Sequence, residues 1–289
     1  MSIVEKALGK AQGKTAGETA DQLLDQNLRG DVHRLPTREE PRPHSSITIS
    51  REDLIAQRMT PRPEHQLRLT NELRRVKRPL LEPLLSPPAD GAEAVRREII
   101  VTSSVPNEGK TFITLNLALS IASEKDCKVL LVDGDLAKPH LTALFGQTDQ
   151  PGLTDLLADE TRDPFDCISD TNIDGLWFMS AGKVNPNAPE LVASRRMRQI
   201  CKIIAARDPK RIVLFDSPPV LASNEAQALS SHIQNILVVV RADFTAPDTL
   251  SDTLRVLGEK RINCILNRAP KSTTSPFYGT YGVYGSNSS

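Results

Sequence analysis

The chain has 289 residues, and its 36 Lys+Arg are balanced by 36 Asp+Glu, so the formal net charge is zero. This length allows one large domain or two small ones, and the balanced charge provides no global field for nucleic acid or an anionic membrane. We therefore expect no nucleic-acid partner. The four cysteines form no CxxC pair, which argues against a zinc site or a disulfide framework and suits a reducing cytosol.

No apolar run in the chain approaches the roughly 18 residues that span a bilayer. The first residues, Met-Ser-Ile-Val-Glu-Lys-Ala-Leu, contain an acidic side chain and no long apolar segment, so they do not resemble a signal peptide. We predict a cytoplasmic protein without a transmembrane segment, for which any membrane role must come through a partner.

Residues 1–90 form a proline-rich segment of their own. Nine of the 21 prolines fall between residues 31 and 90, and the first aromatic residue of the chain is Phe112. Such a segment can bury little apolar surface, and this burial would not offset the conformational entropy lost on folding. We therefore predict that it is largely extended or disordered, with helical islands. One island is the amphipathic start of the chain, and another is 64–78, which Pro79 should end.

From about residue 93 apolar strands alternate with amphipathic helices, and we assign 91–270 to one domain. The expected strands are 98–103, 128–133, 176–180, 211–216, 235–241 and 262–267, and the expected helices are 110–123, 188–206, 224–231 and 247–259. Several strands are continuous apolar runs, which are typical of parallel strands buried on both faces. The alternation predicts a doubly wound, mostly parallel α/β sheet with its ligand at the carboxyl ends of the strands.

A phosphate-binding loop follows the first expected strand and precedes a helix. It ends in Gly-Lys-Thr, and Ser104 stands where such loops usually have their first glycine. Backbone N–H groups and the helix N-terminus would bind phosphate, Lys110 would reach the β and γ oxygens, and the Thr111 hydroxyl would bind Mg²⁺. The expected ATP-binding residues of the loop are Ser104, Val105, Pro106, Asn107, Glu108, Gly109, Lys110 and Thr111.

Two further strands end in aspartates at the edge where this loop opens. One is followed by Asp133-Gly-Asp135, and the other ends in Asp216-Ser-Pro-Pro. Mg²⁺ prefers one or two carboxylates together with phosphates and water, and a neighbouring carboxylate can deprotonate an attacking hydroxyl. An aspartate at a strand end is also a common turn or helix cap. Asn267, at the end of the last strand, either contacts the adenine of ATP or caps a loop.

All three tyrosines lie in the last twelve residues, as Tyr278, Tyr281 and Tyr284. They alternate with glycine, so residues 271–289 have no apolar face to bury, and we expect a mobile tail. Three accessible phenols on a flexible tether suit modification or binding. The alternative is a low-complexity tail that is prone to stacking or aggregation.

Together these sites resemble the Walker A, Walker A′ and Walker B motifs of the bacterial tyrosine kinases, the P-loop autokinases of capsule and exopolysaccharide export. The A′ motif continues to Lys138-Pro139, with Ala137 where the family often has Arg, and Asn185-Pro-Asn-Ala-Pro-Glu-Leu resembles another stretch of the family. The resemblance covers about residues 64–289. It is greatest to the tyrosine autokinases that are encoded with exosortase-linked exopolysaccharide loci.

The resemblance implies a partitioning-ATPase-like P-loop fold and transfer of phosphate from Mg-ATP to Tyr278, Tyr281 and Tyr284. Lys110 would neutralise charge in the transition state, and either Asp133 or Asp135 would accept the phenolic proton. The metal would be held by Thr111, Asp133 and Asp216. Transfer would occur in trans inside a homo-oligomeric ring, and a separate inner-membrane protein of the polysaccharide chain-length type would activate the kinase.

An upstream motif bears on assembly. Glu72, Arg75 and Arg78 match the Glu-x2-Arg-x2-Arg pattern with which similar kinases form rings, and a spacing of three places them on one helix face. The alternative is an exposed, self-paired helix surface that contributes little to stability.

Two rival functions come from other classes of protein. One is a switch ATPase of the partitioning type without kinase activity, although the signature Lys of that family is absent near the start of the loop. The other is a non-enzymatic assembly factor in which Ser104 and Ala137 mark a decayed site. A switch ATPase would hydrolyse ATP independently of the tyrosines, and a decayed site would show no stabilisation by Mg-ATP.

Overall fold

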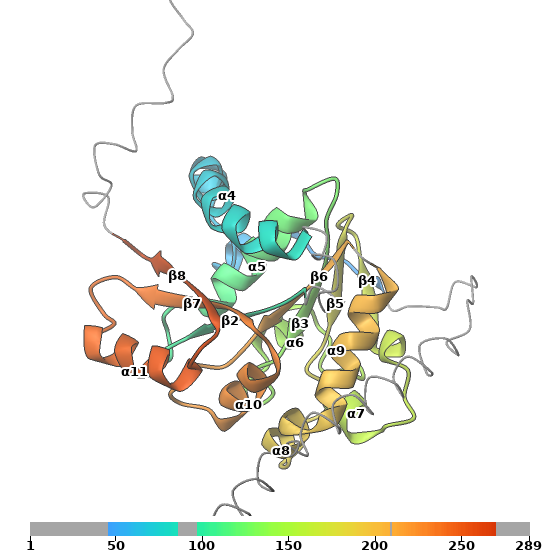
Figure 1. Ribbon diagram of the computed structural model, residues 1–289. Helices are drawn as coiled ribbons and strands as arrows, with labels where there is room; N and C mark the ends of the chain where they lie inside the picture. Colours follow the sequence, from blue (N-terminus) through green and yellow to red (C-terminus); the bar gives the residue numbers. More distant parts are fainter. Residues whose placement is uncertain (1–45, 86–96, 209, 270–289) are drawn as a thin grey trace, which may run out of the picture. The chain divides into compact units, whose positions relative to one another are not determined.

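The computed structural model describes residues 46–85, 97–208 and 210–269, so the predicted amphipathic start and the tyrosine tail lie outside the described residues (Figure 1). The strands are β1 (Ser46–Ile47), β2 (Glu98–Ser103), β3 (Lys128–Asp133), β4 (Ile168–Thr171), β5 (Leu176–Met179), β6 (Arg211–Asp216), β7 (Asn235–Arg241) and β8 (Arg261–Asn267). The α-helices are α3 (Arg51–Ala56), α4 (Pro63–Leu85), α5 (Lys110–Ala122), α6 (His140–Leu144), α7 (Leu153–Ala158), α8 (Ala188–Ala193), α9 (Arg195–Arg207), α10 (Asn224–His232) and α11 (Pro247–Leu257), and η1 (Pro164–Cys167) is a short 3-10 helix.

The eight described strands form one sheet in the order β1-β4-β5-β3-β6-β2-β7-β8. All neighbouring pairs are parallel except β4 and β5. The predicted mostly parallel α/β sheet is therefore confirmed, and the six expected strands are all present. The strand that precedes the phosphate loop, β2, lies between β6 and β7, so the loop opens near the middle of the sheet's carboxyl edge.

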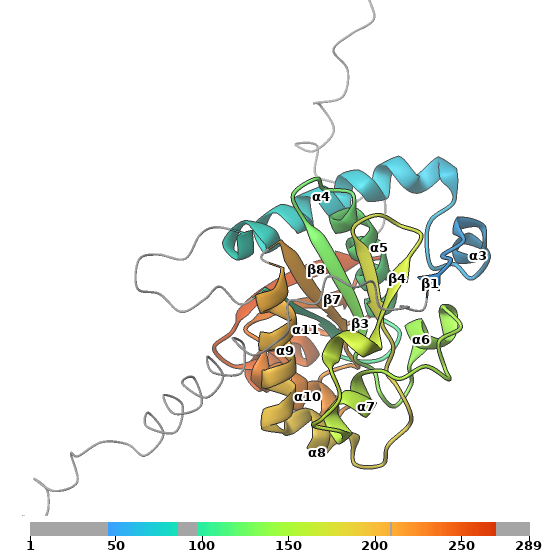
Figure 2. The ribbon, with the colours of Figure 1, turned by 90° about the vertical axis from the view of Figure 1, so that its right-hand side faces the viewer.

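Helices cover both faces of the sheet, with α4 and α5 on one side and α7 to α11 on the other (Figures 1 and 2). Alternate residues of each central strand enter two separate apolar cores. In β2, Ile99 and Val101 pack with α5, whereas Ile100 packs with the core of α7 to α10. Burial on both faces explains why these strands are continuous apolar runs and do not alternate with polar residues.

The predicted helical island at 64–78 is confirmed by α4, but the prediction that the rest of residues 46–85 is largely extended or disordered is wrong. Here β1 pairs with β4 at one edge of the sheet, and α4 packs along α5. The apolar side chains of this segment, which are all aliphatic, are enough to join the core of the domain. Composition alone missed this contact because the partner surface is supplied by residues far away in the chain.

The prediction that a helix ends at Pro79 is also wrong, because α4 continues through Pro79 and Pro83 to Leu85. Each proline removes one donor from the helix and costs about 3 kcal/mol in an isolated helix interior. Packing offsets this cost, since Leu80, Leu81 and Leu84 are buried against the sheet and α5.

The continuation of α4 can be tested with two neighbouring leucines. Leu84 is 1% exposed and Leu85 is 39% exposed. We expect Leu84→Ala to lower the free energy of unfolding by about 2–4 kcal/mol, because it leaves a cavity in the core. Leu85→Ala, the matched control, should cost less than about 1 kcal/mol. Urea unfolding measures both, and equal small losses would contradict the packing of this last turn.

Two smaller differences concern local breaks. The expected helix 188–206 is divided at Ser194, which has an extended backbone and whose hydroxyl donates to the carbonyl of Leu191. Serine commonly competes with helix hydrogen bonds in this way.

The short elements β1, β4, α6 and α7 were not expected from the pattern. Within the described residues, no helix is both long enough and apolar enough to cross a bilayer.

Candidate nucleotide-binding site

The phosphate loop runs from the end of β2 to the first residue of α5, as predicted. Two of its residues have positive φ angles, Asn107 at 68° and Gly109 at 94°. A Cβ atom at Gly109 would lie 2.2 Å from Nδ2 of Asn267. This position therefore needs glycine for two reasons, the positive φ angle and the close approach of the Asn267 side chain. The loop thus leads directly into the N-terminus of α5, where backbone N–H groups bind phosphate.

Glu108 stabilises the phosphate loop by hydrogen bonds, and its side chain is fully buried. One carboxylate oxygen accepts the N–H of Val105 at 2.7 Å, and the other accepts the hydroxyl of Thr245. The amide of Asn267 donates to the Glu108 carbonyl oxygen at 2.8 Å. The loop is therefore tied to the segments that follow β7 and β8, a connection that no sequence spacing indicated.

Ser104, which replaces the usual first glycine, is also fully buried. Its hydroxyl lies 2.8 Å from that of Thr253 on α11, so the extra polar group has a partner. This contact accounts for serine at the start of the loop without strain. The sequence offered no signal for Thr253, because 149 residues separate the two hydroxyls.

The two strand-end aspartates lie side by side, since Asp133 and Asp216 are register partners on β3 and β6. Asp133 is fully buried and accepts both the N–H (2.7 Å) and the hydroxyl (2.8 Å) of Thr142. Burial, and then the charge of Asp216, raise the pKa of Asp133 to about 7 despite these hydrogen bonds. Asp133 can therefore hold or release a proton near neutral pH.

Asp216 is fully buried too, and one of its oxygens accepts the Thr114 hydroxyl at 2.9 Å. Burial raises the pKa of Asp216, whereas the charge of Lys110 and the hydroxyls of Thr111 and Thr114 lower it by less. Its second oxygen, Oδ2, has no hydrogen-bond partner within the described part of the chain. An orphaned buried carboxylate oxygen needs an explanation, and a bound cation is one.

Lys110, the loop lysine, forms an ion pair with Asp135, in which Nζ and Oδ2 are 3.2 Å apart. The other oxygen of Asp135 accepts the N–H of Lys138 at 3.1 Å. The predicted residues of the two Asp-bearing loops and of the phosphate loop thus converge on one point of the sheet's carboxyl edge.

The residues present fit Mg²⁺. The hydroxyl of Thr111 and the free oxygen of Asp216 are hard oxygen donors, and Asp133 lies beside them. Among the described residues there is no group of three or more His, Cys, Asp or Glu side chains that could hold a metal by itself. Mg²⁺ is usually held by few carboxylates and completed by phosphate and water, which the oxygen donors of Thr111 and Asp216 would suit.

The remaining predicted residues lie elsewhere or outside the described part. Glu72, Arg75 and Arg78 are exposed on α4, opposite its buried leucines. Glu72 forms an ion pair with Arg68 at 2.7 Å, one helical turn before it. Tyr278, Tyr281 and Tyr284 are not among the described residues.

Fold and site define a P-loop nucleotide-binding α/β protein, and comparisons with known proteins narrow this class. No protein-family model matches the chain. It is 30% identical to tyrosine-protein kinase YwqD of Bacillus subtilis over 191 residues, which cover 65% of this chain and 78% of YwqD. It is 30% identical to tyrosine-protein kinase etk of Escherichia coli K12 over 184 residues, which cover 62% of this chain and 24% of etk.

Solved structures agree with these relatives. The chimerical protein CapA2B2 is 26% identical, with a TM-score of 0.61 over 85% of this chain and 99% of that chain. The VpsO kinase domain is 30% identical, with a TM-score of 0.57 over 72% of this chain and 98% of that chain. The chain therefore belongs to the bacterial tyrosine-protein kinase family. It spans about a quarter of the length of etk and of the Klebsiella and Ralstonia relatives.

Proposed function

We propose that the protein is an ATP-dependent tyrosine autokinase that phosphorylates Tyr278, Tyr281 and Tyr284. The observation that carries the proposal is the convergence of Lys110 and two buried strand-end aspartates on one phosphate loop. The family relation adds that relatives with such a domain are tyrosine-protein kinases. The chain holds all of its tyrosines in the tail, so an autokinase has its substrate there.

ATP would lie along residues 104–111, with its phosphates on the backbone N–H groups at the start of α5. Lys110 would leave Asp135 and bind the β and γ oxygens. Thr111, Asp216 and Asp133 would hold Mg²⁺, which supplies positive charge to the phosphates. Asn267, already fixed to Glu108, would border the nucleotide and contact its adenine.

In the transfer step, a phenolic oxygen of the tail attacks the γ-phosphorus, the bond to the β–γ bridging oxygen breaks, and ADP leaves. The phenolic proton passes to Asp133 or to Asp135. Both carboxyl groups lie at this edge of the sheet, Asp133 at the end of β3 and Asp135 two residues after it. Asp135 is engaged with Lys110 before the nucleotide arrives.

We further propose that transfer takes place in trans within a ring assembled through Glu72, Arg75 and Arg78. Their exposure on α4 leaves them accessible to a neighbouring subunit. The ion pair between Arg68 and Glu72 is exposed and weak, so a neighbour can displace it at little cost. The activator would be a polysaccharide chain-length protein of the inner membrane, and the kinase would regulate exopolysaccharide export at an exosortase-linked locus.

Mass spectrometry of the tail peptide tests this proposal. We expect phosphate on one or more of the three tail tyrosines in protein from cells that also make the products of the neighbouring genes. Replacing all three with phenylalanine removes every tyrosine of the chain, so this variant is the blank of the phosphotyrosine assay, and it should bind Mg-ATP as the wild type does because the site itself is unchanged. Tail phosphotyrosine at the wild-type level in a Lys110→Met variant would show that another kinase modifies the tail, and it would contradict autophosphorylation. Unmodified tyrosines in the wild type, with ATP hydrolysis intact, would favour the switch ATPase.

A further inference from the structure

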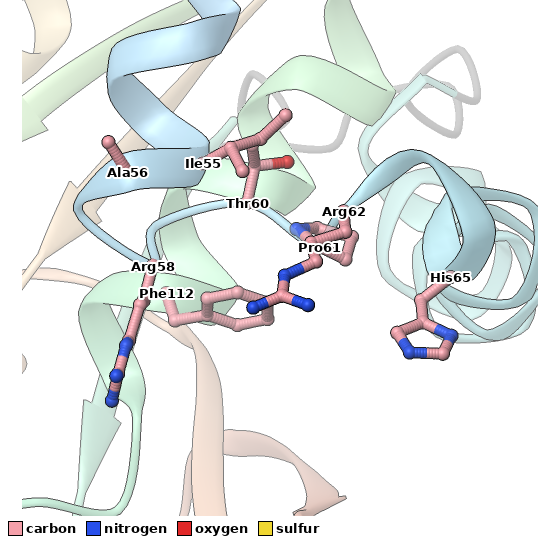
Figure 3. Close-up of a pocket in the computed structure, with 8 residues that line it drawn as sticks. All are labelled: Ile55, Ala56, Arg58, Thr60, Pro61, Arg62, His65 and Phe112. Atoms are coloured by element: carbon pink, nitrogen blue, oxygen red, sulfur yellow. The ribbon is translucent and has the colours of Figure 1, made fainter.

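A second pocket lies beside the phosphate loop, on the far side of the first turn of α5 (Figure 3). Its volume is about 660 Å³, and it is formed by the end of α3, the α3–α4 turn, the first turn of α4 and Phe112. Phe112 directly follows Lys110 and Thr111 in the chain. The pocket therefore shares a helix with the nucleotide site, but none of the residues that line it was assigned to ATP or to the metal.

The wall of this pocket is held rigidly against α5. The buried hydroxyl of Thr60 donates to Asn116 at 3.1 Å, and the Asn116 amide donates to the carbonyl of Met59 at 2.8 Å. Arg58, two residues after the end of α3, has a φ angle of 58°, a conformation usually taken by glycine just after a helix. The turn is therefore preorganised, which reduces the ordering cost of binding.

The pocket is lined by three basic side chains, Arg58, Arg62 and His65, and by no acidic side chain. Figure 3 shows the Arg62 guanidinium beside the Phe112 ring, whereas the Arg58 side chain extends downward from the turn and His65 lies further along, on α4. Within the described residues, neither guanidinium has a side-chain hydrogen bond or an ion pair. Arg68, further along α4, is instead paired with Glu72. A pocket lined by two uncompensated guanidiniums and an aromatic ring suits a ligand that is both anionic and aromatic.

The tail of this chain becomes such a ligand when it is phosphorylated. Residues 270–289 contain no Asp or Glu, so an unmodified side chain there offers no anion. Each phosphorylated tyrosine carries about −1.5 to −2 charges on a ring that can pack against Phe112. About 50 Å of extended chain can lie between Ala269 and Tyr284, so the tail tyrosines can extend well beyond the end of β8.

We propose that this pocket is a phosphotyrosine-binding site that captures the phosphorylated tail. The proposal rests on the proposed autokinase function, because the ligand is its product. Arg58 and Arg62 bind the phosphate, and Phe112 packs against the ring. Since the unmodified tail has no negative side chain, the pocket discriminates product from substrate and retains the modified tail beside the active site.

The test measures binding of two synthetic peptides of residues 274–289 to the full chain after treatment with a tyrosine phosphatase. One peptide is phosphorylated at Tyr281 and the other is not. We expect the phosphopeptide to bind at least about 10-fold more tightly, and Arg58→Ala with Arg62→Ala to weaken it by at least about 10-fold, given the strength of charge-assisted pairs. A control with Arg74→Ala and Arg261→Ala makes the same change of charge outside the pocket and should bind as the wild type does.

Three results would overturn the inference: equal affinities for the two peptides, equal losses in the two double variants, or displacement of the phosphopeptide by inorganic phosphate as readily as by free phosphotyrosine. Thermal melting shows that the variants are folded. Because the phosphopeptide is synthetic, failure of this binding leaves the autokinase proposal intact. An unphosphorylated tail in cells would contradict the autokinase proposal, even if the synthetic phosphopeptide binds to the pocket.

Discussion

Replacing Lys110 with methionine is expected to lower the initial rate of tail phosphorylation by at least about 100-fold, the usual effect of removing a group that stabilises transition-state charge. The side chain of methionine has a similar length and no charge, so the phosphates lose their cation. Asp135 loses its ion pair but keeps the hydrogen bond from the N–H of Lys138, so the fold should survive. The measurement is the rate of phosphotyrosine formation with saturating Mg-ATP.

Lys125→Met is the matched control for this change. Lys125 follows α5 at its other end and is exposed, so its loss should leave the rate within about twofold of the wild type, as is usual for surface substitutions. Thermal melting of both variants without nucleotide separates loss of catalysis from loss of structure. If Lys110→Met retained more than about a third of the wild-type rate, the role of this lysine in charge neutralisation would be excluded.

Replacing Asp133 with asparagine is expected to stabilise the metal-free protein at neutral pH while abolishing most of its kinase activity. The wild-type carboxyl group has a pKa of about 7 in the folded state, against 3.8 for an unperturbed aspartate. Between these values the unfolded state is ionised and the folded state holds its proton, so wild-type stability falls as pH rises. The difference corresponds to roughly 4 kcal/mol at most above pH 7.

The asparagine variant carries no charge to bury, so its advantage over the wild type should grow from nearly zero at pH 4 to a plateau above pH 7. Its oxygen can accept from Thr142 as the carboxylate does. The amide NH₂ faces the N–H of Asp135, which lies 3.3 Å from Oδ1 in the wild type, so the gain should be about 1–3 kcal/mol, less than the full difference.

Urea unfolding in EDTA across this pH range measures the stability change, and the phosphorylation rate with Mg-ATP should fall at least about 100-fold. Asp149→Asn, at an exposed carboxyl group, is the control and should change neither quantity. A difference in stability that does not depend on pH would contradict the buried, partly protonated state of Asp133. An undiminished rate would exclude Asp133 as base and as metal ligand.

The amino-acid sequence by itself determined the sheet and the position of the nucleotide site. The strands could be predicted because strands that are buried on both faces consist of consecutive apolar residues. The predicted bounds of β2, β3 and β6 agree with the observed ones. The convergence of Asp133 and Asp216 was predictable too, since the carboxyl ends of parallel strands meet at one edge. These features depend on local pattern and on topology, which a single sequence records.

Only the tertiary structure decided which partners complete the site. The hydroxyls of Thr142, Thr245 and Thr253 engage Asp133, Glu108 and Ser104 from segments that no motif contains. Their positions follow from how loops pack over the carboxyl edge, and threonine is too common in loops for spacing to single it out. The same is true of the pocket at Phe112, to which α3, α4 and α5 contribute separately.

The course of α4 has the same physical explanation. Local propensity opposes a helix through Pro79 and Pro83, and the structure nevertheless contains it because Leu80, Leu81 and Leu84 are buried against α5 and the sheet. The cost of two prolines is local and can be read from the chain. The burial that offsets it comes from contacts with segments distant in sequence, and those exist only once the sheet has formed.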